Sequence, residues 1–149
     1  QSQGRSVSAA NYAEMLAVGG CPALLIDLDW TGMFLSEKIT PAARFGLAEL
    51  ASIDHSVQSE QAFWYDERTS LYFLPNRSFA QDAVFDPLVF DSNRLKALIH
   101  ALSPQFDCIV LDLSPLSISS DAAAMAEIVS AFVAVADWGQ TKSSSLSSE

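Results

Sequence analysis

The stretch that decides the fold is Ala23–Asp29, with the sequence ALLIDLD. Its first four residues are all apolar, which is typical of a strand buried on both faces of a parallel sheet. Asp27 and Asp29 lie two residues apart, so their side chains project to the same side of an extended backbone. Open α/β sheets bind ligands beyond the carboxyl ends of their strands. The stretch therefore predicts a buried strand that delivers two acids to a ligand site.

Residues 106–112, FDCIVLD, repeat this design with Asp112 as the terminal acid. Hydrophobic periodicity and helix-capping residues predict further elements around these two strands. Residues 30–44 are expected to be irregular, with a short helical turn opened by Pro41, and residues 52–70 contain no predicted element. The alternation indicates an α/β fold with a mostly parallel sheet flanked by helices. The predicted helices are 7–18, 46–51, 91–102 and 120–129, and the predicted strands are 23–28, 71–74, 107–112 and 131–136.

Length and composition predict a single domain over residues 1–149. Half of the residues are hydrophobic, which is enough for a core, and the formal net charge is −10. Such an acidic chain lacks the basic surface that nucleic acid requires, but backbone amides can still bind the phosphates of a nucleotide. No stretch reads as a membrane span or a signal peptide, so this segment is expected to be soluble. The polar end, residues 143–149, is expected to fray.

Two groups of residues could carry phosphate chemistry. Gly4, Arg5 and Ser6 precede a predicted helix, where a glycine-rich loop can bind phosphates through amides, a cation and a hydroxyl. Asp27, Asp29 and Asp112 end buried strands and could bind magnesium or orient a nucleophile. An isolated Gly-Arg-Ser tripeptide is more often the ordinary capped start of a helix, and a single strand-end acid is often structural.

In their order along the chain, these motifs resemble a known family. Residues 4–13, GRSVSAANYA, are similar to the end of a Walker A loop and its helix. Residues 24–29, LLIDLD, resemble the Walker A-prime strand, and residues 106–115, FDCIVLDLSP, resemble the Walker B strand. Ser-Asp-Ala at 120–122 resembles the segment that comes after Walker B in the same family. The family is that of the bacterial tyrosine kinases, or BY-kinases, which are cytoplasmic domains of polysaccharide co-polymerases.

The resemblance implies a P-loop NTPase-like three-layer sandwich that binds ATP or ADP with Mg²⁺ and phosphorylates tyrosines. By position, Gly4, Arg5 and Ser6 would bind the nucleotide, Ser6, Asp27 and Asp112 the metal, and Asp27, Asp29 and Arg5 would be catalytic. The implied role is the regulation of exopolysaccharide polymerisation and export at the cytoplasmic face of the bacterial inner membrane. The implied partners are a homo-oligomer, a membrane-embedded part of the same longer protein and the export machinery.

The chain departs from the family pattern in ways that keep alternatives open. Arg5 replaces the loop lysine, Trp30 replaces an arginine, and no tyrosine cluster ends the chain. The strand that leads into the loop in this family would lie before Gln1. The first alternative is therefore a catalytically impaired P-loop module for interaction or assembly in the same machinery. Two others are a ParA/MinD-like positioning ATPase and, with Asp112 as phosphate acceptor, a receiver domain.

Overall fold

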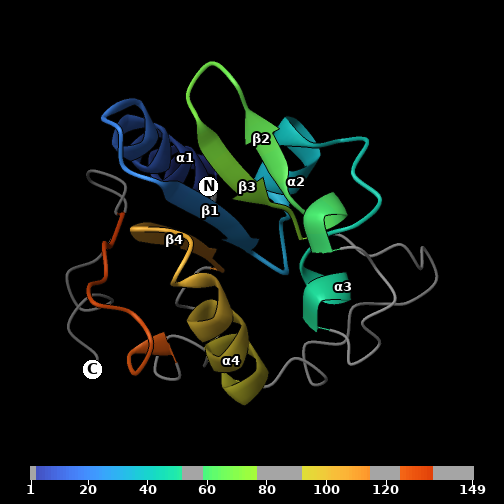
Figure 1. Ribbon diagram of the computed structural model, residues 1–149, viewed down its shortest axis with the longest axis vertical. Helices are drawn as coiled ribbons and strands as arrows, with labels where there is room; N and C mark the ends of the chain where they lie inside the picture. Colours follow the sequence, from blue (N-terminus) through green and yellow to red (C-terminus); the bar gives the residue numbers. More distant parts are fainter. Residues whose placement is uncertain (1–2, 52–58, 77–91, 115–124, 136–149) are drawn as a thin grey trace.

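A computed structural model describes residues 3–51, 59–76, 92–114 and 125–135. The described residues form four strands, which make one sheet, and five helical segments (Figure 1). In chain order the elements are α1 Gln3–Val18, β1 Ala23–Leu28, α2 Phe34–Ile39, α3 Leu47–Ala51, the 3₁₀ helix η1 Ser59–Ala62, β2 Trp64–Asp66, β3 Leu71–Leu74, α4 Ser92–Leu102 and β4 Cys108–Leu113.

The four strands lie in the order β2-β3-β1-β4, so β1 is internal in the sheet. It pairs in parallel with β3 on one side and β4 on the other, whereas β2 is antiparallel to β3. The six residues of β1 are all buried. The prediction of a mostly parallel sheet organised around this strand is therefore confirmed.

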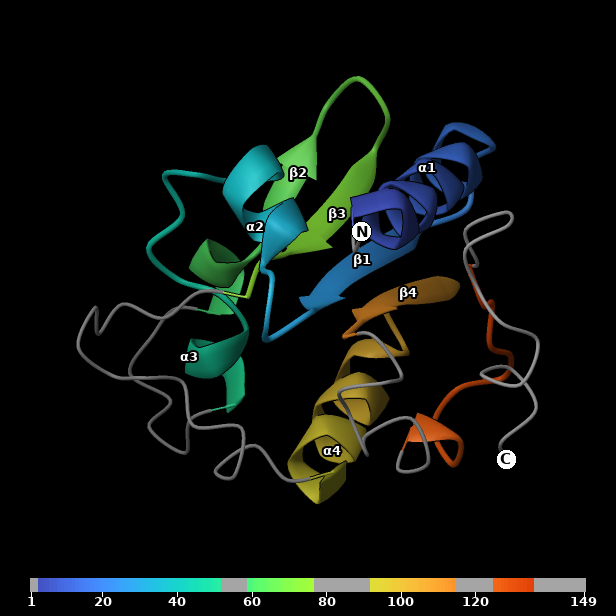
Figure 2. The same cartoon turned by 180° about the vertical axis from the view of Figure 1, so that it is seen from behind.

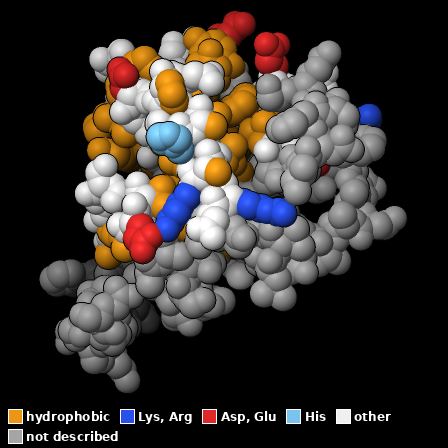
Figure 3. Space-filling view, turned by 60° about the horizontal axis from the view of Figure 1, so that its bottom comes forward, with side chains coloured by type: hydrophobic (Ala, Val, Ile, Leu, Met, Phe, Trp, Pro, Cys, Tyr) orange, Lys and Arg blue, Asp and Glu red, His pale blue; other side chains and the backbone are white. Residues whose placement is uncertain are grey.

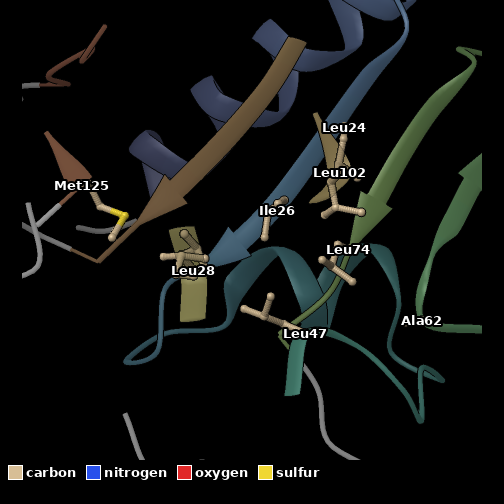
Figure 4. Close-up of a cluster of buried hydrophobic side chains, with 9 residues drawn as sticks. Leu24, Ile26, Leu28, Leu47, Ala62, Leu74, Leu102 and Met125 are labelled. Carbon is tan, nitrogen blue, oxygen red and sulfur yellow. The ribbon is translucent and has the colours of Figure 1, made fainter. Parts of the chain in front are cut away.

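Helices cover both faces of the sheet, with α1 and α2 on one side and α3 and α4 on the other (Figures 1 and 2). Because side chains alternate between the two faces of a strand, β1 contributes to two hydrophobic clusters, one on each face of the sheet. Leu25 packs with Ala13 of α1 and Leu35 of α2. The opposite face carries the larger cluster, in which Ile26 and Leu28 lie beside side chains from β3, α3 and α4 (Figure 4). This arrangement is the predicted three-layer sandwich.

Helix α1 begins earlier than the sequence indicated. The prediction started it at residue 7, but Gly4, Arg5 and Ser6 already lie in its first turns. Its end agrees with the prediction, because the helix stops at Val18 and Gly20 adopts a left-handed φ of 87°. The amide of Cys21 then donates to the carbonyl of Leu16. Glycine is the residue that accepts this conformation without steric cost.

The segment between β1 and α3 was wrongly predicted as irregular with a helical turn at Pro41. Instead α2 occupies Phe34–Ile39, and Pro41 lies in a turn beyond its end. The helix begins after Met33, whose φ of 44° is unusual for a residue with a side chain, and no side chain caps it. Further along the chain, η1 and β2 lie in the stretch where no element was predicted.

The buried strand predicted near the C-terminal end is wrong for the described residues. Residues 131–135 were predicted to begin a buried strand, but they are irregular and exposed, and Val133 is 84% accessible. In the predicted helix 120–129, Met125 is helical and a turn follows it. Residues 120–124, residue 136 and the predicted frayed end at 143–149 lie outside the described residues.

Two further observations concern the described helices and the described surface. Within the described ranges, none of the helices combines the length and apolar character that crossing a bilayer requires. Seen from the α4 side, hydrophobic side chains gather in the upper part of the described surface, and basic side chains are scattered (Figure 3).

Candidate functional site

The three predicted acids lie at one edge of the sheet. Asp27 and Asp112 are direct partners in the parallel pairing of β1 and β4, and Asp29 follows the end of β1. The exposed fractions of Asp27, Asp29 and Asp112 are 0%, 0% and 1%. Parallel strands bring their carboxyl ends to the same edge, so two stretches separated by about 80 residues in sequence meet there. The structure thus brings together the acids that the sequence singled out.

Arg5 reaches this edge from the first turns of α1. Its Nη2 donates to Asp29 Oδ2 at 2.7 Å, and its Nε donates to Asp112 Oδ1 at 3.2 Å. The arginine side chain is 21% exposed, whereas both acids are buried. One guanidinium therefore bridges the ends of two adjacent strands, a geometry that its planar fork permits.

Asp29 is held by a dense set of donors. Its Oδ1 accepts hydrogen bonds from the amide and hydroxyl of Thr31, the amide of Gly32 and the hydroxyl of Ser114. Burial by itself would raise the pKa of Asp29, but these hydrogen bonds and the charge of Arg5 outweigh it and lower the pKa. A Cβ at position 32 would come within 2.9 Å of Asp29 Oδ2, so a larger residue there would force the Asp29 carboxylate to shift away from its donors.

Asp27 is anchored to α2 instead. The hydroxyl of Ser36 donates to Asp27 Oδ2 at 2.6 Å and its amide donates to the same oxygen at 2.9 Å. The amide of Asp29 donates to the other oxygen. Burial raises the pKa of Asp27, and the hydrogen bonds offset this rise only in part. Both oxygens of Asp27 are therefore engaged within the protein.

Asp112 and Ser6 each retain an unused oxygen. Asp112 Oδ2 and Ser6 Oγ are buried and form no hydrogen bond of ordinary geometry with described residues. Burial raises the pKa of Asp112 and outweighs the opposing influence of the nearby Ser6 and Arg5. Buried polar atoms in folded proteins normally have a partner. With Asn76 Nδ2, these two oxygens are the buried polar side-chain atoms without such a partner among the described residues, and they are candidates to bind a ligand.

The sequence reasoning missed the residues that orient the acids. Thr31, Ser36 and Ser114 donate to carboxylates, and the amide of Asn76 donates to Ser36 Oγ at 2.7 Å. Ser36 depends on α2, which was not predicted, and Asn76 follows β3. The one sequence signal for these residues was their position, because Thr31, Asn76 and Ser114 come just after strands, at the edge where α/β sheets bind ligands.

The oxygen atoms at this edge decide whether Mg²⁺ fits the site. Mg²⁺ is usually bound by one or two carboxylates together with water and phosphate oxygens. Ser6 Oγ and Asp112 Oδ2 meet that requirement, whereas the oxygens of Asp27 are already engaged. Among the described residues, no group of three or more His, Cys, Asp or Glu side chains is arranged to hold a metal ion. The residues present therefore fit Mg²⁺ that arrives with phosphate ligands.

We expect Ser36→Ala to lower the free energy of unfolding by about 2 kcal/mol, because a buried carboxylate oxygen loses a donor and the buried Asn76 amide loses its acceptor. Ser103 is the matched control, since its hydroxyl is exposed and, among the described residues, donates to the carbonyl of His100. Denaturant unfolding of both alanine variants measures the difference. An equal, small change in the two variants would contradict a role for Ser36 in supporting Asp27.

Comparison with known proteins places this site in context. No family model matches the chain. Over 141 residues, or 95% of the chain, it is 34% identical to the succinoglycan biosynthesis transport protein ExoP of Rhizobium meliloti (strain 1021). The chain spans 18% of that relative's length. The likeness includes nearly all of this chain but a small part of ExoP.

Solved structures share the fold. The kinase domain of VpsO has a TM-score of 0.70 and 25% identity, and the match covers 83% of this chain and 59% of that one. The kinase domain of the Escherichia coli tyrosine kinase ETK has a TM-score of 0.66 at 18% identity, over 83% of this chain and 46% of that one. MinD of Aquifex aeolicus has a lower TM-score of 0.56 at 26% identity, over 82% and 47%.

The shared fold does not separate kinase domains from MinD, but the sequence relative does. The match to ExoP covers 95% of this chain. The fold of the VpsO kinase domain is more similar to this chain than the fold of MinD, with TM-scores of 0.70 and 0.56. The acids, arginine and serine occupy one edge of the sheet, as the resemblance implied. The chain therefore belongs to the bacterial tyrosine-kinase-like domains of the ExoP type.

Proposed function

We propose that this chain is an ATP-binding, kinase-like domain on the cytoplasmic side of a longer, membrane-attached protein that regulates exopolysaccharide polymerisation and export. The identity with ExoP over 95% of the chain supports the assignment to this machinery. Because the chain spans 18% of ExoP, the membrane-embedded part would belong to the rest of such a protein. Self-association into a homo-oligomer would bring a tyrosine of one subunit to the site of another.

The observation that carries nucleotide binding is a pair of neighbouring buried oxygens, Ser6 Oγ and Asp112 Oδ2, which form no hydrogen bond of ordinary geometry with the described residues and lie beside Arg5 at the start of α1. A helix of 16 residues presents free amides and a partial positive charge at its first turn, which favours a phosphate group. A Cβ at Gly4 would meet nothing within 4 Å, so the space beside this glycine is open. Phosphates could approach the backbone there.

The residues of the site would have separate roles. The amides near Gly4 and the guanidinium of Arg5 would bind phosphate oxygens, and Ser6 with Asp112 would hold Mg²⁺. When bound, Mg²⁺ supplies charge neutralisation at the phosphates of ATP. Asp27 and Asp29 would hold the neighbouring loops in place through their networks of donors. Burial and ordered donors at this edge would exclude bulk water from the phosphate group.

A second candidate is a catalytically impaired module that acts through subunit contacts. It is favoured by one observation, the engagement of Arg5 with two acids. An arginine held in this way is less free to move with a transferring phosphate than a lysine would be. Under this alternative, Arg5→Lys would still yield no tyrosine phosphorylation in a chain that includes tyrosine-containing flanking sequence. Phosphate on tyrosine would contradict it.

Calorimetric titration with ATP and Mg²⁺ tests the proposed binding. We expect saturable binding, weakened about tenfold by Ser6→Ala, because a hydroxyl bound to a cation or phosphate contributes roughly that much. Ser8→Ala is the matched control, since Ser8 lies on the same helix but is exposed and bonds to the carbonyl of Gly4.

Absence of binding at millimolar ATP would overturn the nucleotide proposal and leave the assembly module. Equal affinity in the Ser6 and control variants would show that the nucleotide binds elsewhere.

A further inference from the structure

Arg5 makes a contact that the family resemblance does not explain. Two nitrogens of its guanidinium donate to two different carboxylates, Asp29 Oδ2 at 2.7 Å and Asp112 Oδ1 at 3.2 Å. The acids come from the ends of adjacent strands, and the arginine comes from a helix on one face of the sheet. The contact therefore joins α1, β1 and β4 at a single point.

The acids need such a partner. Asp29 and Asp112 are 0% and 1% exposed, and two buried carboxylates near each other repel. A positive charge beside them relieves this repulsion, and at acid pairs that serve phosphate chemistry this charge is often a divalent cation. Arg5 brings a permanent positive charge that is covalently part of the chain.

We infer that Arg5 is a built-in substitute for a divalent cation at Asp29 and Asp112, so that the protein holds α1, β1 and β4 together without Mg²⁺. This goes beyond the proposed function and does not depend on it, since the contact joins side chains of the chain itself. A positioning role of this kind also explains why an arginine is suitable here. Its fork reaches two carboxylates at once, whereas an ammonium group is a single point charge.

The remaining oxygens agree with this inference. Oδ1 of Asp29 accepts four hydrogen bonds, and Oδ2 accepts from Arg5. Within the described part of the chain, Asp112 Oδ2 is the one oxygen of these two carboxylates without a hydrogen bond. Without phosphate, Mg²⁺ would have Asp112 Oδ2 and Ser6 Oγ as ligands, and the nearby guanidinium of Arg5 would repel it. Free Mg²⁺ should therefore add little to the stability of the protein.

The test is the melting temperature of the nucleotide-free protein with and without millimolar MgCl₂, compared with KCl at equal ionic strength. For the unaltered chain we expect no shift beyond that of KCl. Arg5→Met keeps much of the side chain's apolar bulk but removes its charge, and should lower the melting temperature by about 10 °C. MgCl₂ should restore at least half of that loss, because the ion can then occupy the position of the guanidinium.

Arg68→Met is the matched control, because Arg68 also pairs with an aspartate, Asp66, but its side chain is 88% exposed. It should change the melting temperature little and should not respond to Mg²⁺. The inference is overturned if Mg²⁺ stabilises the unaltered chain as much as the Arg5 variant. It is also overturned if Arg5→Met melts no lower than Arg68→Met, or if Mg²⁺ restores nothing.

Arg5→Met could prevent folding altogether, so a second variant separates charge from packing. In Arg5→Met/Asp29→Asn/Asp112→Asn the acids are neutral and no cation is needed. We expect this triple variant to fold and to show no response to Mg²⁺. Its reference is Asp29→Asn/Asp112→Asn with Arg5 kept, because both variants lose the same hydrogen bonds at position 29. If the triple variant is less stable than this reference, Arg5 acts through packing and the inference is wrong. Because ATP is absent throughout, failure of nucleotide binding would leave this result unaffected.

Discussion

Replacing Ile26 with alanine is expected to lower the free energy of unfolding by about 4 kcal/mol, because three buried carbon groups are lost and a cavity remains. Ile26 is 0% exposed and belongs to the larger core cluster (Figure 4). It lies opposite Leu74 of β3 and Leu111 of β4 in the sheet. Neighbours on both sides leave the site little freedom to collapse.

Val18→Ala is the matched control for the loss of a β-branched side chain. Val18 is 67% exposed at the end of α1, so its truncation should change stability by less than about 0.5 kcal/mol. Urea unfolding followed by far-ultraviolet circular dichroism measures both variants. If Ile26→Ala cost no more than the control, β1 would not be the centre of the core.

The same strand explains why much of the fold could be predicted. Residues 23–28 form an apolar run that suits burial on both faces, and β1 has the predicted bounds. β4 and α4 were predicted on equally plain patterns. Short elements gave weaker signals, because β2 has three residues and α2 begins at a left-handed Met33 without a side-chain cap.

Residues 131–135 show where pattern alone fails. An apolar run predicts burial, but a strand also needs a neighbouring strand to bond with. These residues pair with no strand of the described sheet and remain exposed. The sequence pattern cannot supply the partner, so the prediction of a strand at this position was wrong for these residues.

In the candidate site too, some residues could be predicted from the sequence and others could not. The acids could be predicted because strand ends in an α/β sheet converge at one edge. Their hydrogen-bond donors could not, because Ser114 and Asp29 are far apart in sequence and meet only through the pairing of β1 and β4. The bridging contact of Arg5 likewise depends on how α1 packs over the sheet.

Asp29→Asn is expected to cost about 3 kcal/mol of unfolding free energy at neutral pH, because it leaves the charge of Arg5 partly unpaired and weakens the donors around the side chain. The carboxylate accepts four hydrogen bonds at Oδ1 and the guanidinium at Oδ2. An amide offers one acceptor oxygen and places two N–H donors where donors already point. Asp66→Asn is the matched control, since Asp66 pairs with an arginine at the exposed surface.

The difference between the unaltered chain and Asp29→Asn should depend on pH in one direction. The pKa of Asp29 is lowered in the folded protein, so folding favours its charged form. This contribution is fully present above the pKa of an unfolded aspartate, about 3.9, and is lost as pH falls through the lower folded value. Urea unfolding from neutral to acid pH should therefore bring the two curves together below about pH 4. A difference that stayed constant across this range would mean that Asp29 stabilises the site by shape rather than by charge.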